Sequence, residues 1–149
     1  MRPHIVYYDP GEQSQVVTRE VPDLAGKRVV IVEDEGLTLL QIRRVLVSAG
    51  MTIVGTAING AEGIEVVLRE RPDLVMMDVR MPVLDGIQAA QKILDVYEVC
   101  IVMVTAFSDE TYRRESDKIG ACGYVVKPIS GDTLLPELQA LMAQFHRVN

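Results

Sequence analysis

The sequence predicts an α/β protein in which five parallel strands form a doubly wound sheet with helices on both faces. From residue 27 onward, short apolar runs alternate five times with segments of helical periodicity. One run, Leu74–Met77, contains no charge and ends abruptly at Asp78, as expected of a strand buried on both faces. The helical segments are apolar on one face only, so they require a sheet to pack on.

The first strand and helix follow Lys27. Val29–Val32 is the predicted strand, and Gly50 provides a stop for the helix after it. That helix should bury one face, made of Leu39, Ile42, Leu46 and Ala49. Thr52–Ala57 is then the second strand, and it closes on Thr56–Ala57 without a charged residue, as expected of an edge strand away from a ligand site.

The third strand, Leu74–Asp78, lies between two predicted helices. Asn59 can cap the helix before it, with Glu62 at the capping-box position. The inward residues of that helix should be Ile64, Val67 and Leu68. The helix after the strand, Asp85–Leu94, should bury Ile87, Ala90 and Leu94.

Cys100–Thr105 and Gly123–Val126 are the last two predicted strands. A final helix begins at Ser130, with Pro136 early enough to predict a local irregularity. Its apolar residues repeat at helical spacing: Leu134, Leu138, Leu141 and Phe145.

Between those strands, the helix Asp109–Ile119 should be weakly anchored. Ser108 can cap it, but its only large apolar residues are Tyr112 and Ile119. Helices with few buried apolar contacts shift at small energetic cost.

Residues 1–26 differ from the rest and form a predicted N-terminal extension to a main domain of residues 27–149. Ile5–Tyr8 and Val16–Thr18 are β-prone, and Asp9–Pro10–Gly11 between them has turn chemistry. A small hairpin is the preferred interpretation. A partly ordered leader or the remnant of a linker is the alternative.

Composition excludes several classes of function. The 149 residues are 48% hydrophobic and 24% charged, and the net charge of −6 argues against direct nucleic-acid binding. Cys100 and Cys122 are interpreted as reduced core thiols, since neither belongs to a metal-binding or CxxC motif. No apolar run is long enough to span a bilayer, so no membrane partner is expected and the predicted location is the cytoplasm.

Polar side chains follow four of the five strands at their carboxyl ends. They are Glu33 and Asp34, Asp78, Thr105, and Lys127. Each alone has an ordinary explanation as a cap, turn or surface residue, but all fall at one edge of the predicted sheet, where open parallel sheets bind ligands. Clustered carboxylates favour a hard divalent cation, by default Mg²⁺. Asp78 is then available as a nucleophile toward phosphorus.

From about residue 27 to 145 the chain closely resembles the receiver domain of two-component response regulators. The resemblance rests on the acidic pair Glu33–Asp34, Asp78 within MDVRMPVLDG, Thr105–Ala106, Tyr124 and Lys127–Pro128. It implies a flavodoxin-like sheet of strand order 2-1-3-4-5. It also implies a signalling domain rather than an enzyme.

The resemblance assigns a role to each matching residue. Asp78 would be the phosphoacceptor, and Asp34 with Asp78 would be Mg²⁺ ligands. Glu33 would act on the metal through water, and the backbone carbonyl of Arg80 would complete the protein ligands. Thr105 and Lys127 would contact the phosphoryl group, Tyr124 would be the switch aromatic, and the Lys127–Pro128 peptide would be cis.

The implied partners are a histidine kinase or histidine phosphotransfer protein as donor, and an output protein that the sequence does not identify. Homodimerisation through the face made by the fourth helix, fifth strand and fifth helix, or through the N-terminal extension, is possible. The Gly120–Tyr124 segment lacks the acidic residue that winged-helix regulators use in their dimer. Thr105–Ser108, the run Gly120–Pro128 and the last helix are more similar to receivers that precede RNA-binding antiterminator domains. No such domain follows, so a stand-alone receiver or an excised fragment is expected.

Two alternative functions stay open. The protein could be a phosphorelay intermediate that passes its phosphoryl group to another histidine. A Mg²⁺-dependent phosphohydrolase is disfavoured, because Arg80 stands where haloacid-dehalogenase-like enzymes have a second acid. Arg80 and Phe107, two residues after Asp78 and Thr105, should also obstruct an attacking water, so slow dephosphorylation is expected.

Overall fold

The five parallel strands form one sheet in the order 2-1-3-4-5, as predicted. The computed structural model describes residues 4–8, 16–20, 23–106 and 110–148, with side chains from residues 23 to 106 and 110 to 146. The strand order in space is β4-β3-β5-β6-β7, and every pairing in this sheet is parallel. The strands are β3 (Arg28–Val32), β4 (Thr52–Ala57), β5 (Leu74–Asp78), β6 (Cys100–Thr105) and β7 (Gly123–Val126).

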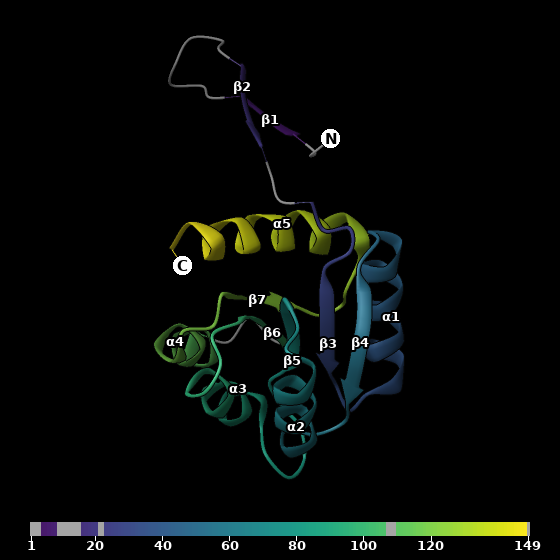
Figure 1. Cartoon of the computed structure of the whole chain (residues 1–149), viewed down its shortest axis with the longest axis vertical. Coiled ribbons are helices and arrows are strands. Elements are labelled where there is room, and N and C mark those ends of the chain that lie inside the picture. The colour runs from purple at the N-terminus through teal and green to yellow at the C-terminus, as the bar shows by residue number, and fades with distance from the viewer. Residues whose placement is uncertain (1–3, 9–15, 21–22, 107–109, 149) are drawn as a thin grey trace.

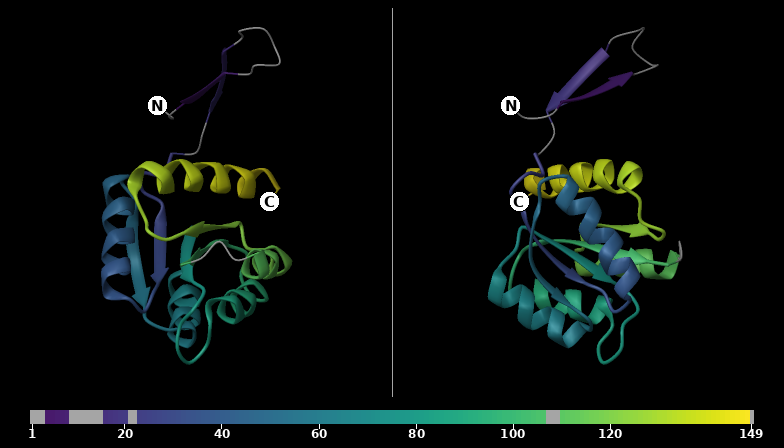
Figure 2. Two further views of the ribbon diagram at one scale, coloured as in Figure 1. Left: turned by 180° about the vertical axis from the view of Figure 1, so that it is seen from behind. Right: turned by 90° about the vertical axis from the view of Figure 1, so that its right-hand side faces the viewer.

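In the described part of the chain five helices cover the sheet, two on one face and three on the other (Figures 1 and 2). The helices α1 (Gly36–Ser48) and α5 (Gly131–Val148) share one face. The other face is covered by α2 (Gly60–Glu70), α3 (Gly86–Leu94) and α4 (Glu110–Ile119). Within the described part of the chain, no helix is both long and apolar enough to cross a membrane.

Two hydrophobic cores follow from the alternation of side chains along the strands. Under α1 and α5, Ile31 and Met76 pack with Ile42, Leu46 and Leu138. The second core, under α2, α3 and α4, is built from residues such as Val30, Val32, Met77, Ile93 and Met103. Every residue of β5, the central strand, and of its neighbour β6 is buried, so neither strand has a face exposed to solvent.

Local signals set the helix ends largely as expected. The Asn59 side chain accepts a hydrogen bond of 2.9 Å from the Glu62 amide. A reciprocal capping box starts α3, between Asp85 and Gln88, and the sequence analysis did not predict it. Burial within the helices shifts by a residue in places: Val66 joins Val67 in the core, and Ile93 rather than Leu94 is fully buried. Pro136 lies within α5, which continues to Val148.

The N-terminal segment contains two strands that pair antiparallel and form a sheet of their own. They are β1 (His4–Tyr8) and β2 (Val16–Glu20), with His4 opposite Glu20 and Tyr8 opposite Val16. The predicted turn at Asp9–Pro10–Gly11 and the predicted cap at Ser108 lie outside the described residues. The division into an extension of residues 1–26 and a domain of residues 27–149 stays a prediction.

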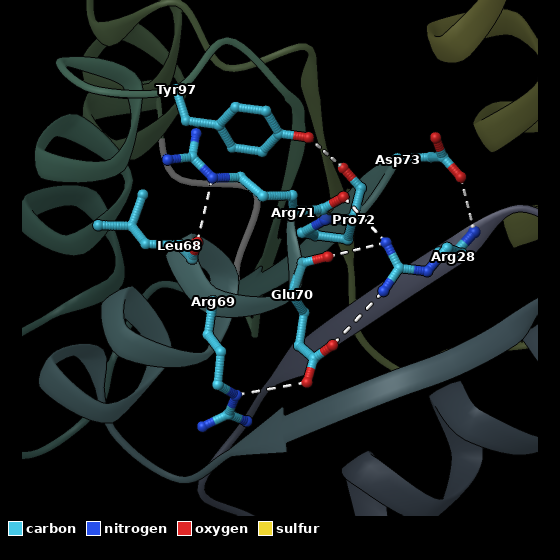
Figure 3. A network of polar contacts seen from close by, with 8 residues as sticks. All are labelled: Arg28, Leu68, Arg69, Glu70, Arg71, Pro72, Asp73 and Tyr97. Carbon is cyan, nitrogen blue, oxygen red and sulfur yellow. Dashed lines mark hydrogen bonds and ion pairs between the residues drawn. The ribbon is translucent and has the colours of Figure 1, made fainter.

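A polar network ties the amino ends of the strands together, at the edge opposite the predicted site (Figure 3). The Arg28 guanidinium donates to the carbonyl oxygens of Glu70 and Arg71 at 2.8 and 3.1 Å, which satisfies the end of α2. The Arg28 amide donates to Asp73 Oδ2 at 2.8 Å, and the Tyr97 hydroxyl donates to the Pro72 carbonyl at 2.7 Å. Polar residues at this edge therefore bind one another and stabilise the fold.

The loop after β5 contains a strained turn. Leu84 N–H donates to the Pro82 carbonyl at 2.8 Å, and Val83 between them has a φ of 72°. This is a γ-turn with positive φ, a conformation that is rare and unfavourable for a β-branched residue. Gly86 closes the loop against β5, where a Cβ would collide with the carbonyl oxygen of Asp78.

We predict that Val83→Gly stabilises the protein. Val83 is 81% exposed, so the loss of its side chain removes little packing, while glycine adopts positive φ without strain. The free energy of unfolding in urea should rise by about 1 kcal/mol. The matched control is Val96→Gly, at another exposed valine with 63% exposure and an ordinary φ. There the free energy should fall by roughly 0.5–1 kcal/mol because the unfolded chain gains freedom. Equal losses in both variants would contradict the assignment of strain to Val83.

Candidate functional site

Strand register brings the predicted site residues to one level of the sheet. Val32 pairs with Met77, so Glu33 and Asp34 emerge next to Asp78. Asp78 pairs with Val104 and Thr105 pairs with Val126, which places Lys127 one residue beyond. The Lys127 amide donates to the Thr105 carbonyl at 2.8 Å, and the Lys127–Pro128 peptide is cis, as expected. The chain passes from β3 to β4 on one side of β3 and then to β5 on its other side, so the strand order reverses next to β3. Open parallel sheets bind ligands at such a topological switch point.

Lys127 is the cation around which the carboxylates gather. Its Nζ lies 2.9 Å from Glu33 Oε1, 3.1 Å from Glu35 Oε1 and 3.5 Å from Asp78 Oδ1. Glu33 is 1% exposed and Asp78 is 4% exposed, so both charges are removed from water. One ammonium group therefore faces several carboxylates, and the site holds an excess of negative charge.

The excess charge changes the protonation of the site. Burial, a hydrogen bond with Glu33 and the charge of Glu33 raise the pKa of Asp78 to about 8, although Lys127 acts in the opposite direction. Burial alone lowers the pKa of Lys127, but its close contacts with Glu33 and Glu35 outweigh burial and hold that pKa above its usual value. The Lys127 ammonium thus stays charged, while burial and the neighbouring Glu33 disfavour the charged form of Asp78.

The oxygens of this site fit a hard divalent cation. Glu33, Asp34 and Asp78 each offer a carboxylate oxygen, and the three oxygens lie within 4.8 Å of one another. Oε1 of Glu33 is buried 2.9 Å from the Lys127 ammonium, so one of these oxygens already binds positive charge. Mg²⁺ prefers such all-oxygen sites with one or two carboxylates and bound water.

A small cavity of about 110 Å³ opens beside Asp78. It is lined by residues at or just after the ends of four strands and in the loop after β5, namely Glu35, Asp78, Val79, Arg80, Thr105, Ala106 and Lys127. Thr105 is buried, with 5% exposure, and belongs to the wall of this cavity. The cavity places one hydroxyl, one ammonium and the Asp78 carboxylate around a common space.

Two predicted residues border the site without joining its carboxylates. Tyr124 on β7 is half-buried and packs against the core under α2, α3 and α4, with the Arg113 guanidinium 5.4 Å from its ring centroid. The side chain of Arg80 is exposed, and its Nε donates to the Tyr112 hydroxyl at 3.0 Å. Phe107 lies outside the described residues.

Glu35 forms an ion pair with Lys127 that was not predicted from the sequence. Glu35 directly follows the acidic pair at the end of β3, and its backbone amide donates to Glu33 Oε2 at 3.3 Å. Its place in the run Glu33–Asp34–Glu35 was the available signal. The contact between Arg80 and Tyr112 spans 32 residues of sequence and left no such signal.

Comparison with known proteins assigns the family. The family model of the response regulator receiver domain matches residues 29–139, about three quarters of the chain. The chain belongs to the response regulator receiver family. It is thus a receiver domain of two-component signalling. The CheY-like members of this family are signalling domains. Members that are enzymes, such as the CheB methylesterases, carry their activity in a separate domain.

Curated relatives include both transcriptional and chemotaxis regulators. The transcriptional regulatory protein PdtaR of Mycobacterium tuberculosis is 38% identical over 122 residues, which are 82% of this chain and 60% of PdtaR. The chemotaxis protein CheY of Treponema pallidum is 32% identical over 136 residues, 89% of this chain and 94% of CheY. The chain therefore spans less than two thirds of PdtaR but nearly all of CheY.

Solved structures of receivers have the same fold. The response regulator domain of Thermotoga maritima CheB superposes with a TM-score of 0.73 and 29% identity, covering 83% of this chain and 98% of that one. The CheX–CheY–BeF₃–Mg²⁺ complex of Borrelia burgdorferi gives a TM-score of 0.75 and 26% identity, covering 78% and 90%.

We predict that Asp78→Asn stabilises the protein in the absence of divalent cations. The substitution removes a buried carboxylate that faces Glu33 and Asp34, and leaves Lys127 paired with Glu33 and Glu35. The free energy of unfolding, measured with EDTA present, should rise by about 1–2 kcal/mol. Asp95→Asn, at an exposed carboxylate after α3, is the control and should change stability little. A loss of stability in Asp78→Asn would show that the Asp78 charge is satisfied by Lys127 rather than in excess.

Proposed function

We propose that Asp78 accepts a phosphoryl group from a histidine kinase or a histidine phosphotransfer protein, and that the product alters a protein-binding surface. The observation that supports this most is the cavity, in which the Asp78 carboxylate is buried 3.5 Å from the Lys127 ammonium and shares a wall with Thr105. Membership of the receiver family supports the same conclusion independently.

In the proposed reaction, an Asp78 oxygen attacks phosphorus as the bond from phosphorus to the donor histidine nitrogen breaks. The leaving nitrogen takes the electron pair, and an acyl phosphate forms on Asp78. Lys127 then turns from Glu33 and Glu35 toward one phosphoryl oxygen, and the Thr105 hydroxyl donates to another. Each contact neutralises charge where it develops in the transition state.

Mg²⁺ is the proposed cofactor. Asp34 and Asp78 would bind it directly, Glu33 through water, and the Arg80 backbone carbonyl would complete the protein ligands. When bound, the ion offsets the charge of the carboxylates and of the phosphoryl oxygens. The solved complex of CheY with BeF₃ and Mg²⁺ from Borrelia burgdorferi supports this assignment by similarity.

The proposed output surface consists of α4, β7 and α5. A groove of about 460 Å³ runs along β7 and α5 and is lined by Tyr124 and Lys127 among others, so it begins at the site. We propose that Thr105 draws toward the phosphoryl group, that the Tyr124 ring follows inward, and that this surface changes shape. A homodimer through this surface or the N-terminal extension, and slow dephosphorylation set by Arg80 and Phe107, stay predictions.

The proposal is tested by intact-protein mass spectrometry after incubation with acetyl phosphate, a small-molecule phosphoryl donor. With Mg²⁺ the wild type should gain the mass of one phosphoryl group, and with EDTA it should gain none. Asp78→Asn should gain none under either condition, because amide nitrogen and oxygen do not form the acyl phosphate. Asp95→Asn, the surface control, should behave like the wild type.

A wild type that gains no mass, or an Asp78→Asn variant that gains as much as the wild type, would contradict the proposal. If the wild type is labelled, adding a histidine phosphotransfer domain distinguishes a phosphorelay intermediate, since only a relay protein passes the label on.

A further inference from the structure

The helix α4 packs on α3 and β7 but buries few of its own side chains. Of its ten residues, all described, only Ser116 is fully buried, and the Ser116 hydroxyl donates to the Tyr112 carbonyl within the same helix. Tyr112 and Ile119 add partly buried apolar surface. The position of α4 therefore depends strongly on the individual side-chain contacts that it makes with neighbouring elements.

One of those contacts joins α4 to the loop of the phosphoryl cavity. Arg80 Nε donates to the Tyr112 hydroxyl at 3.0 Å, and the Arg80 guanidinium carbon lies 5.4 Å from the centroid of the Tyr112 ring. The same arginine lines the cavity together with Asp78, Thr105 and Lys127. Arg80 therefore stands between the reacting carboxylate and the helix.

A second contact joins α4 to the predicted switch residue. The guanidinium of Arg113, the residue after Tyr112, lies 5.4 Å from the centroid of the Tyr124 ring on β7. A displacement of α4 would therefore change the contact between Arg113 and the Tyr124 ring directly, without any movement of Thr105.

We propose that the contact between Arg80 and Tyr112 is a charge-sensitive latch that holds α4 in place until Asp78 is phosphorylated. Phosphorylation then draws the guanidinium from Tyr112 to the phosphoryl group and releases the helix. This inference rests on the proposed function of Asp78, and it adds a route from the site to α4 beside the one through Thr105 and Tyr124.

The physical basis is a competition for one guanidinium. The Tyr112 hydroxyl is a neutral acceptor, whereas an aspartyl phosphate brings nearly two negative charges and three acceptor oxygens into the cavity that Arg80 lines. Such an anion adds a Coulomb attraction that the neutral hydroxyl lacks, and arginine can bind phosphate oxygens with two parallel hydrogen bonds. The Tyr112 hydroxyl and the phosphoryl group therefore compete for the Arg80 guanidinium, and weakening the contact with Tyr112 favours the contact with the phosphoryl group.

The test measures the affinity for beryllofluoride, a phosphoryl mimic, in the presence of Mg²⁺. Tyr112→Phe keeps the ring but removes the hydroxyl, so it should raise the affinity by about two- to fivefold, since the guanidinium no longer gives up its hydrogen bond to that hydroxyl. Arg80→Gln removes the cation and should lower the affinity by a similar factor of about two to ten. The control is Arg114→Gln, on the same helix and paired only weakly with Glu110 at 4.0 Å, which should match the wild type.

Amide hydrogen exchange of the protein without the mimic gives a second readout. In both Tyr112→Phe and Arg80→Gln, exchange at residues 110–119 should be about two- to fivefold faster than in the wild type. Circular dichroism of each variant checks that the overall fold is kept.

The opposite signs expected for the two affinities exclude a merely structural role, which would lower both or change neither. If the wild type binds beryllofluoride and both variants bind as the control does, the latch is wrong while the phosphoacceptor function stands. A decrease in affinity in Tyr112→Phe also overturns the latch. A wild type that binds no beryllofluoride contradicts both.

Discussion

The structure depends on one electrostatic imbalance, in which a single lysine faces several carboxylates at a buried edge of the sheet. Lys127 lies within 3.5 Å of Glu33, Glu35 and Asp78, and Asp34 brings a further carboxylate to the same place. Such a cluster is unfavourable by itself, because burial and like charge both oppose ionisation. A divalent cation would relieve part of that cost, because it would add positive charge among the carboxylates. The fold therefore holds Asp78 in a state that should gain stability when such a cation binds.

The rest of the molecule divides into a rigid part and a part that can respond. The strands β5 and β6 are fully buried, and the polar network at the opposite edge fixes the amino ends of the strands. The loop after β5 contains the strained turn at Val83, and the lightly buried helix α4 contacts the same loop through Tyr112 and Arg80. A change of charge at Asp78 thus meets a fixed scaffold on one side and a helix of low local stability on the other, so the helix is the element expected to move.

Much of this arrangement was predictable from the sequence because strand ends are easy to locate. Apolar runs that stop at Glu33, Asp78, Thr105 and Lys127 predict one common edge in any parallel sheet, and the order 2-1-3-4-5 followed from the family resemblance. The inward faces of the helices were less predictable, because packing sets how far each helix is rotated about its axis. Val66 and Ile93 are fully buried, whereas the predicted Leu68 and Leu94 are only partly buried. The contacts of Glu35 with Lys127 and of Arg80 with Tyr112 could not be predicted, because long flexible side chains choose partners only after the backbone is placed.

The claim that ligand binding relieves carboxylate repulsion is tested most directly by the free energy of unfolding measured over a series of Mg²⁺ concentrations. For the wild type, the account predicts that this free energy rises with Mg²⁺ and, near saturation, gains about 1.4 kcal/mol for each tenfold increase in concentration. In the double variant Asp34→Asn and Asp78→Asn, which keeps the fold but removes two of the three clustered carboxylates, the dependence should be lost. A wild type whose stability does not change with Mg²⁺, or a double variant that gains as much, would contradict the account.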